Sequence, residues 1–163
     1  MPQDAQLLTD LSAQAFREAY SKVTVTAEME EHIARHFHLA AQQSELLNSA
    51  FLIAECEKRP AGYVRLWQSD APVCVKGPAP LQISRFYLRS EWYGKGVAAQ
   101  LMEACHDFAR SQQAQTLWLM VWSQNQRAQR FYQKCGFAQV GFAEFLFAGR
   151  VVADDWVMAR SVD

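Results

Sequence analysis

The stretch YLRSEWYGKGVAAQLM, residues 87–102, decides how this chain folds. It joins the end of a β-type run to an amphipathic helical pattern, and Gly94 and Gly96 flank Lys95 at the junction. Glycine is a poor helix former, so two glycines at the start of a helix need a reason. Backbone amides at a helix N-terminus lack internal partners and carry partial positive charge. A strand, a glycine turn and a helix in this order therefore indicate either a tight turn or a phosphate site.

Two known phosphate-binding motifs are absent from the sequence, and their absence limits the kind of phosphate site that it can form. The sequence has no GxGxxG, which argues against a dinucleotide fold, and no GxxxxGK[ST], which argues against a P-loop. Lys95 supplies a positive charge, but no Ser or Thr follows it to hold magnesium. What remains is a site that binds a diphosphate without a metal.

Composition sets outer limits on the function. The chain has 163 residues, of which 50% are hydrophobic, and a net charge of -1, which suits one domain over residues 1–163 and argues against nucleic acid as the main partner. No apolar run approaches the roughly 20 residues of a membrane helix, and the N-terminus does not resemble a signal peptide. Four sparse cysteines without metal spacing predict a reduced, cytoplasmic protein without a metal site. His32 and His36 lie one helical turn apart, and we interpret them as a solvated helix face rather than metal ligands.

The hydrophobic periodicity predicts a mixed α/β sheet with flanking helices. A nearly continuous apolar run at residues 116–122 is typical of a central strand covered on both faces. Helices are expected at residues 4–20, from about 27 onward, at about 94–112 and at 126–137; strands are expected at 50–57, 61–68, 81–88, 116–122, 137–148 and 151–161, with residues 149–150 as a turn.

Two stretches carry a resemblance to the GNAT superfamily of acetyl-CoA-dependent N-acetyltransferases. YGKGVA, residues 93–98, is similar to the family pattern Arg/Gln-x-x-Gly-x-Gly/Ala, except that Tyr93 replaces the Arg or Gln. VWSQNQRAQRFYQKCGF, residues 121–137, resembles the second signature, in which an Asn opens a short helix ending in Phe-Tyr-x-x-x-Gly-Phe. The resemblance covers nearly the whole chain from residue 2. It implies a mostly antiparallel GNAT-like sheet, and the family's first strand is expected to be missing because residue 2 lies where the first helix would begin.

The resemblance implies a site for acetyl-CoA as co-substrate. The diphosphate would lie on backbone amides of a loop comprising Tyr93, Gly94, Lys95, Gly96, Val97, Ala98 and Ala99. The backbone of Phe86 and Leu88 would pair with the pantetheine arm. Asn125 would contact the cofactor, although Asn is also a favoured helix N-cap, and Ser123 could cap instead.

Catalysis is expected to need an acid and a base. Tyr132 would contact the cofactor and protonate the leaving thiolate, although it shares a helix face with Ala128 and Cys135 as a core aromatic would. Enzymes of this type often carry a carboxylate on the strand before the glycine turn, but residues 81–88 contain neither Asp nor Glu. Ser84 could orient a water molecule there. The base is left open among Glu28, Glu55, Glu57 and solvent.

The acceptor is expected to be a small cationic amine. The first two helices and the last two strands, which should form the acceptor region, carry six carboxylates: Glu28, Glu30, Glu31, Glu144, Asp154 and Asp155. The C-terminal half also resembles polyamine-type acetyltransferases, so transfer of acetyl to a polyamine by direct attack is the leading hypothesis. The alternatives are a non-catalytic acyl-CoA-binding module and an acetyltransferase acting on a protein N-terminus or lysine. Apolar terminal strands also favour a homodimer.

Overall fold

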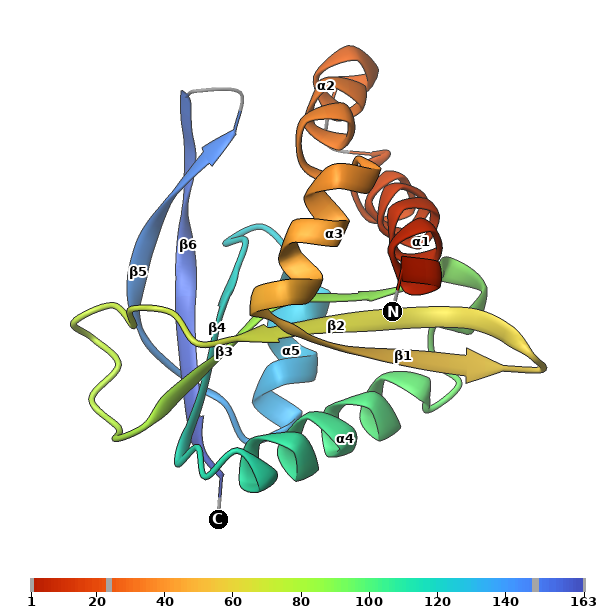
Figure 1. Ribbon diagram of the computed structural model, residues 1–163. Helices are drawn as coiled ribbons and strands as arrows, with labels where there is room; N and C mark the ends of the chain where they lie inside the picture. The colour runs from red at the N-terminus through yellow and green to blue at the C-terminus, as the bar shows by residue number, and fades with distance from the viewer. Residues whose placement is uncertain (1, 23–24, 148–149, 163) are drawn as a thin grey trace. The chain divides into compact units, whose positions relative to one another are not determined.

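The computed structural model describes residues 2–22, 25–147 and 150–162 (Figure 1). Six strands form one sheet in the order β1-β2-β3-β4-β6-β5, mostly antiparallel, with β3 and β4 parallel. This confirms the predicted α/β class and places the apolar run of β4 inside the sheet. The elements are α1 (Pro2–Tyr20), α2 (Thr26–His36), α3 (Leu39–Asn48), β1 (Ala50–Cys56), β2 (Arg59–Trp67), β3 (Pro80–Leu88), η1 (Ser90–Trp92), α4 (Val97–Ser111), β4 (Thr116–Val121), α5 (Gln126–Lys134), β5 (Ala138–Phe147) and β6 (Arg150–Ser161). The turn predicted at residues 149–150 lies partly outside the described residues.

Helix α3 is the main element that the sequence did not predict separately. The second helix was expected to run onward, but α2 ends at His36. His38 then takes an extended conformation, and its Nδ1 accepts a hydrogen bond from the Ala41 amide at 3.2 Å. That bond satisfies an amide of a new first turn, which is what an N-cap does. Histidine is an unusual cap, so the pattern was not recognised.

Two turns differ slightly from their predicted positions. The β1–β2 hairpin turns at Glu57 and Lys58, which have φ of 52° and 59°, so Arg59 and Pro60 already belong to β2. Such paired positive φ values match the twist of a two-residue hairpin loop. Helix α4 begins at Val97 rather than near residue 94, because Gly94 and Gly96 have positive φ, which an α-helix does not accommodate.

The chain divides into two compact units, which are described separately. Unit 1 comprises Met1–Arg65 with Arg85–Leu101, and unit 2 comprises Leu66–Ser84 with Met102–Asp163. The prediction of one domain over residues 1–163 stays a prediction.

The core of unit 1 holds α1 against the strands that lead to the glycine turn. Leu8 and Leu11 of α1 form a buried cluster with Tyr63 of β2, and Tyr87 of β3 packs against it. Gly62 permits a close approach of backbone, because a Cβ there would lie 2.5 Å from the carbonyl oxygen of Tyr87. The end of β3 is therefore held tightly just before the turn.

The core of unit 2 is built on β4. Leu117 and Leu119 are fully buried, and Leu119 pairs with the equally buried Met158 of β6. Nearly every residue of β4 is buried, as expected for a strand with both faces covered. Within the described ranges, no helix is long and apolar enough to cross a membrane.

Candidate functional site

The glycine turn of unit 1 has the geometry of an open anion site. Gly94 and Gly96 have φ of 73° and 82°, and a Cβ built on either would meet no atom within 4 Å. The glycines are therefore not required by packing; they supply the backbone conformation and leave the space above it clear. The carbonyl of Gly96 accepts from the Gln100 amide at 3.2 Å, so the first-turn amides of residues 97–99 have no partner within the helix. These residues fit a diphosphate.

The approach to this turn is tied to α1. The Ser90 amide donates to the Glu18 carboxylate at 2.5 Å, and Arg89 Nε lies 3.8 Å from the same carboxylate. Lys95 Nζ lies 5.0 Å from the centre of the Trp92 ring, a cation–π geometry. The loop thus begins at a fixed point, and its single lysine lies over an aromatic ring.

Phe86 and Leu88 lie on β3 just before the turn. Leu88 is buried, Phe86 is half-buried, and the Arg89 amide donates to the Ala61 carbonyl at 2.8 Å. Pairing of their backbone with a pantetheine arm stays a prediction.

Asn125 of unit 2 caps α5. Its side-chain oxygen accepts from the Ala128 amide at 3.1 Å, while its carbonyl accepts from the Gln129 amide at 3.0 Å. Ser123 takes no capping role here; its carbonyl accepts from Gln129 Nε2 at 2.9 Å. The structure therefore shows the capping function of Asn125, and its contact with a cofactor stays a prediction.

Tyr132 packs as an aromatic residue of unit 2. Its side chain is 7% exposed, with its ring centroid 5.4 Å from that of Phe131 and 6.0 Å from that of Phe137. Gly136, with φ of 86°, lies just after the end of α5, and this position confirms the prediction that the helix stops at this glycine. A tyrosine held on two rings has a fixed orientation, which an acid needs.

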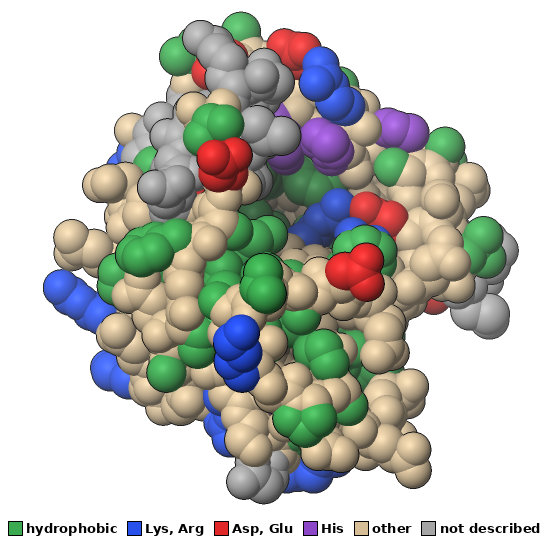
Figure 2. All heavy atoms as spheres, turned by 90° about the vertical axis from the view of Figure 1, so that its left-hand side faces the viewer, with side chains coloured by type: hydrophobic (Ala, Val, Ile, Leu, Met, Phe, Trp, Pro, Cys, Tyr) green, Lys and Arg blue, Asp and Glu red, His purple; other side chains and the backbone are tan. Residues whose placement is uncertain are grey.

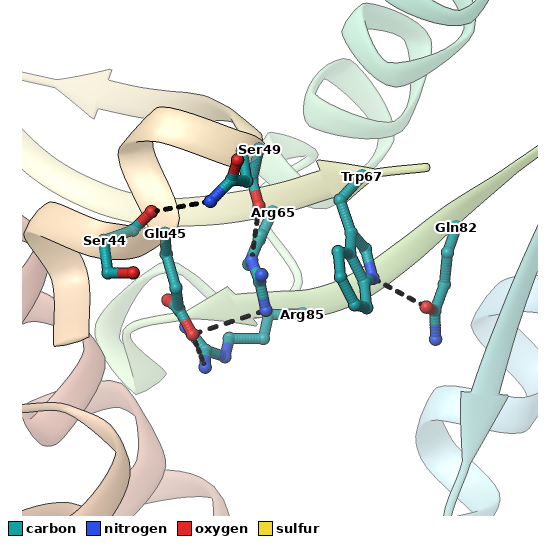
Figure 3. Close-up of polar contacts among 8 residues, drawn as sticks. Ser44, Glu45, Ser49, Arg65, Trp67, Gln82 and Arg85 are labelled. Atoms are coloured by element: carbon teal, nitrogen blue, oxygen red, sulfur yellow. Dashed lines mark hydrogen bonds and ion pairs between the residues drawn. The ribbon is translucent and has the colours of Figure 1, made fainter. Parts of the chain in front are cut away.

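None of the three glutamates considered as the base is fully buried, and which of them acts stays a prediction. Glu55 and Glu57 are exposed, Glu57 lies 3.4 Å from Arg59, and Glu28 is half-buried on α2. On β3, Ser84 is half-buried and belongs to unit 2. Gln82, two positions earlier, is fixed, because its Oε1 accepts from Trp67 Nε1 at 2.7 Å (Figure 3). The same oxygen accepts from the Ser69 hydroxyl at 2.7 Å.

Asp155 of β6 is a stronger candidate for the base, and the sequence indicated it only as one acceptor-region carboxylate. Its residue is 6% exposed, and its Oδ1 has no hydrogen-bond partner among the described residues. Burial raises the pKa of Asp155 from its usual 3.8 to about 6. Since Val121 pairs with Trp156, Asp155 lies just beyond the end of β4 from which the chain continues to α5. In the sequence, the feature that could have identified Asp155 as a base is its place at an inward-facing position of an apolar strand.

A second buried polar group lies on the same side of these strands. Trp118 pairs with Ala159, and Asp155 lies four positions before Ala159 on β6, so the side chains of Trp118 and Asp155 share a face. Trp118 Nε1 is also buried without a hydrogen-bond partner in the described part of the chain. Buried polar groups are normally paired, so these two unpaired groups call for an explanation, and a catalytic role is one.

Two of the three acceptor-region carboxylates on α2, Glu30 and Glu31, are paired with arginines. Glu30 accepts from Arg17 at 2.6 Å, and Glu31 accepts from Arg35 at 2.7 Å. The Arg17 guanidinium holds the pKa of Glu30 below its usual value. Glu144 is exposed on β5, and the side chain of Asp154 lies outside the described residues. Glu30 and Glu31 therefore offer little unpaired negative charge to a cationic amine.

The interpretation of His32 and His36 as a solvated helix face holds for His36, which is exposed, and fails for His32, which is half-buried. The His32 ring stacks on Phe16 with centroids 4.7 Å apart and lies 4.4 Å from the ring of exposed His36. Burial first, then the positive fields of His36, Arg85 and Arg35, lower the pKa of His32 to about 4. In Figure 2, histidines gather on the same face as Lys or Arg and Asp or Glu side chains. No group of three or more potential metal ligands occurs among residues 2–22, 25–147 and 150–162.

Known proteins resemble this chain over most of its length. The model of the acetyltransferase (GNAT) family matches residues 13–137. An uncharacterized N-acetyltransferase of the pepI 3′ region of Lactobacillus delbrueckii subsp. lactis is 28% identical over 147 residues, which cover 89% of this chain and 82% of that protein. An uncharacterized N-acetyltransferase of Mycobacterium tuberculosis is 35% identical over 113 residues, which cover 69% and 67%. The crystal structure of the PaiA N-acetyltransferase of Thermoplasma acidophilum with coenzyme A has a TM-score of 0.76 at 17% identity, covers 98% and 94%, and shows a similar fold.

Proposed function

Because the chain belongs to the acetyltransferase (GNAT) family, and is an acetyl-CoA-dependent acetyltransferase, we propose that it acetylates a primary amine of a small molecule by direct attack. The observation that carries the proposal is the turn at Gly94 and Gly96, where a Cβ on either glycine would meet no atom within 4 Å, just before the first turn of α4. No covalent enzyme intermediate is part of the proposal.

In this proposal the cofactor contacts are mainly backbone contacts. The amides of Tyr93 to Ala99 bind the diphosphate, and the backbone of Phe86 and Leu88 pairs with the pantetheine arm. The absence of Arg or Gln at Tyr93 matters little, because side chains add little to a site made of amides. Asn125 positions α5 through its cap, and any contact of its amide group with acetyl-CoA is secondary.

Gly96→Asn should raise the Kd for CoA by at least about tenfold, because the new side chain enters the space that a diphosphate needs. Asn tolerates positive φ better than other residues, so folding should be affected little. Calorimetric titration with CoA measures the effect, and thermal unfolding checks the fold. The matched control is Gly136→Asn, where φ is 86° at the end of α5, and it should leave the Kd within about twofold. Unchanged CoA binding in Gly96→Asn would refute the diphosphate assignment.

The proposed chemistry uses one base and one acid. Acetyl-CoA supplies an acetyl thioester, whose carbonyl carbon is the electrophile. The acceptor ammonium has a pKa near ~10.4 and must lose a proton before it attacks. Asp155 takes that proton, directly or through a water molecule oriented by Ser84, and passes it to solvent.

The remaining steps balance around Tyr132. The amine nitrogen bonds to the carbonyl carbon, and the carbon–sulfur bond breaks. Tyr132 donates its hydroxyl proton to the departing sulfur, and the second proton lost by the nitrogen restores the Tyr132 hydroxyl. The net products are the acetamide, CoA as a free thiol and one proton.

An acceptor screen tests the proposed function. Wild-type protein, acetyl-CoA and a panel of spermidine, spermine, amino acids and peptides should release free CoA with at least one small amine. CoA binding by calorimetry without thiol release on the whole panel would favour a non-catalytic acyl-CoA-binding module. Peptides that outperform every small amine would favour a protein N-terminus or lysine as the acceptor. The polyamine acceptor stays a prediction that this panel tests.

Two further parts of the proposal concern the protein's environment. Four free cysteines in the described chain are compatible with a reducing cytoplasm. A homodimer is supported by the position of β5 at the edge of the sheet and by the exposure of Phe142, which is 63%. Light scattering coupled to size exclusion measures the oligomeric state.

A further inference from the structure

In unit 1, two arginines from neighbouring strands share one glutamate. Arg85 of β3 donates to both carboxylate oxygens of Glu45 on α3, at 2.6 and 2.8 Å. Arg65 of β2 lies with Nη1 3.4 Å from the same carboxylate, and its Nε donates to the Ser49 hydroxyl at 2.9 Å. Figure 3 shows Glu45 beside both guanidinium groups. The cluster carries two positive charges and one negative charge.

The aromatic and histidine side chains near Arg85 add no negative charge to this cluster. Arg85 lies 4.9 Å from the centre of the Phe37 ring, which contributes no net charge. His32 and His36 have lowered pKa values, chiefly through burial and also through the field of Arg85, so both are neutral at pH 7. The field that opposes their protonation would also oppose a polycation.

The three side chains of the cluster are largely buried, and each keeps a small exposed fraction. The side chains of Arg65, Arg85 and Glu45 are 13%, 14% and 18% exposed. Ion pairs and charge-assisted hydrogen bonds in such a setting are stronger than on an open surface. A planar guanidinium matches a carboxylate in particular, because it donates two parallel hydrogen bonds.

The position of the cluster connects it to the acetyl-transfer chemistry. Arg85 directly precedes Phe86 on β3, where we place the pantetheine arm, and it belongs to the same unit as the glycine turn. An acceptor bound by Arg85 would therefore lie on β3, the same strand that leads to the proposed cofactor site.

We propose that Arg65 and Arg85 bind a carboxylate of the acceptor, so the substrate is an amine that also carries a carboxylate, such as a free amino acid or the C-terminal residue of a short peptide. This inference rests on the proposed acetyltransferase function and replaces the polycation with an amino acid-like acceptor. The competing explanation is structural: the cluster only fastens α3 to the two strands.

Matched acceptors test the inference directly. Lysine and cadaverine share a primary alkylamine and differ in the carboxylate, and a dipeptide ending in lysine tests the peptide source. Wild-type kcat/KM should be at least about tenfold higher for lysine, or for the dipeptide, than for cadaverine, as expected for one charged hydrogen-bonded pair. Equal or better use of cadaverine would overturn the inference.

Variants separate recognition from structure. Arg65→Gln should lower kcat/KM for the carboxylated acceptor by about 10- to 100-fold, mainly through KM, and leave cadaverine within about threefold. Arg65→Lys keeps the positive charge without the planar guanidinium. Its kcat/KM for the carboxylated acceptor should lie between the values of the wild type and Arg65→Gln. The control Arg17→Gln removes an arginine of unit 1 that pairs with Glu30 at the surface and should change neither value.

The outcomes distinguish the two hypotheses. A uniform loss with both acceptors in Arg65→Gln, together with a lower Tm, would show that the cluster is only structural and would overturn the inference. CoA release with cadaverine but not with carboxylated acceptors would overturn it while leaving the proposed function intact. Absence of CoA release with any acceptor would instead contradict the proposed function.

Discussion

Replacing Tyr132 with phenylalanine should lower kcat by about 100- to 1000-fold, the range expected when a general acid is lost. Phenylalanine keeps the ring that packs on Phe131 and Phe137, so the change removes the hydroxyl and little else. Without that hydroxyl the sulfur must leave as an unprotonated thiolate, and the barrier to breaking the carbon–sulfur bond rises. Thiol release under saturating acetyl-CoA and acceptor measures the effect.

Tyr132→Phe should affect turnover and leave acetyl-CoA binding nearly unchanged. The Kd for acetyl-CoA should stay within about threefold, because most proposed cofactor contacts are backbone amides. Tyr63→Phe removes another buried hydroxyl, in unit 1, and should leave kcat within about threefold. Unchanged kcat in Tyr132→Phe would show that Tyr132 is a core aromatic and nothing more.

Several elements of both units were predictable because their signals are local. The apolar run of β4, the stop at Gly136 and the turn at Gly94 and Gly96 each follow from short-range backbone preferences. The boundary between α2 and α3 was missed because His38 caps α3 with a ring nitrogen. Ser, Thr, Asp and Asn at an N-cap position predict the start of a helix, whereas a histidine there does not.

The candidate acceptor cluster could not be predicted because it is formed by the fold. Arg85 and Glu45 are 40 residues apart in the chain, and no periodic pattern links them. The negative charge expected from Glu30 and Glu31 was also misjudged, because a sequence does not reveal that each pairs with an arginine. Charge counts predict a field only where the charges remain unpaired.

Asp155 illustrates the same limit for catalytic groups. Its carboxyl is ordinary in the sequence and becomes a candidate base only through burial on β6 without a hydrogen-bond partner in the described chain. Desolvation favours the neutral form of a carboxyl, so it raises the pKa toward the operating pH, where a general base works best.

Asp155→Asn should lower kcat/KM at pH 7 by about 100-fold or more, since asparagine cannot accept the amine proton. In the wild type, kcat/KM should rise as pH increases through about 6, where Asp155 ionises. This limb should disappear from the pH profile of the variant. Asp107→Asn, at a surface aspartate of α4 whose side chain is 65% exposed, should leave the profile unchanged. Retention of the limb in Asp155→Asn would assign the base to another group.

The same substitution should make the protein more stable at neutral pH, which a merely damaging mutation would not do. The pKa of Asp155 is about 6 in the folded state against a usual 3.8, so the folded state binds the proton more tightly. The stability from this group is complete below pH 4 and is lost as pH rises through 6. At pH 7 the wild type holds a buried charge at a cost of up to about 3 kcal/mol, which asparagine removes. The Tm of Asp155→Asn should therefore exceed that of the wild type at pH 7 and approach it near pH 4, whereas a lower Tm at both pH values would mean that Asp155 is a structural carboxylate.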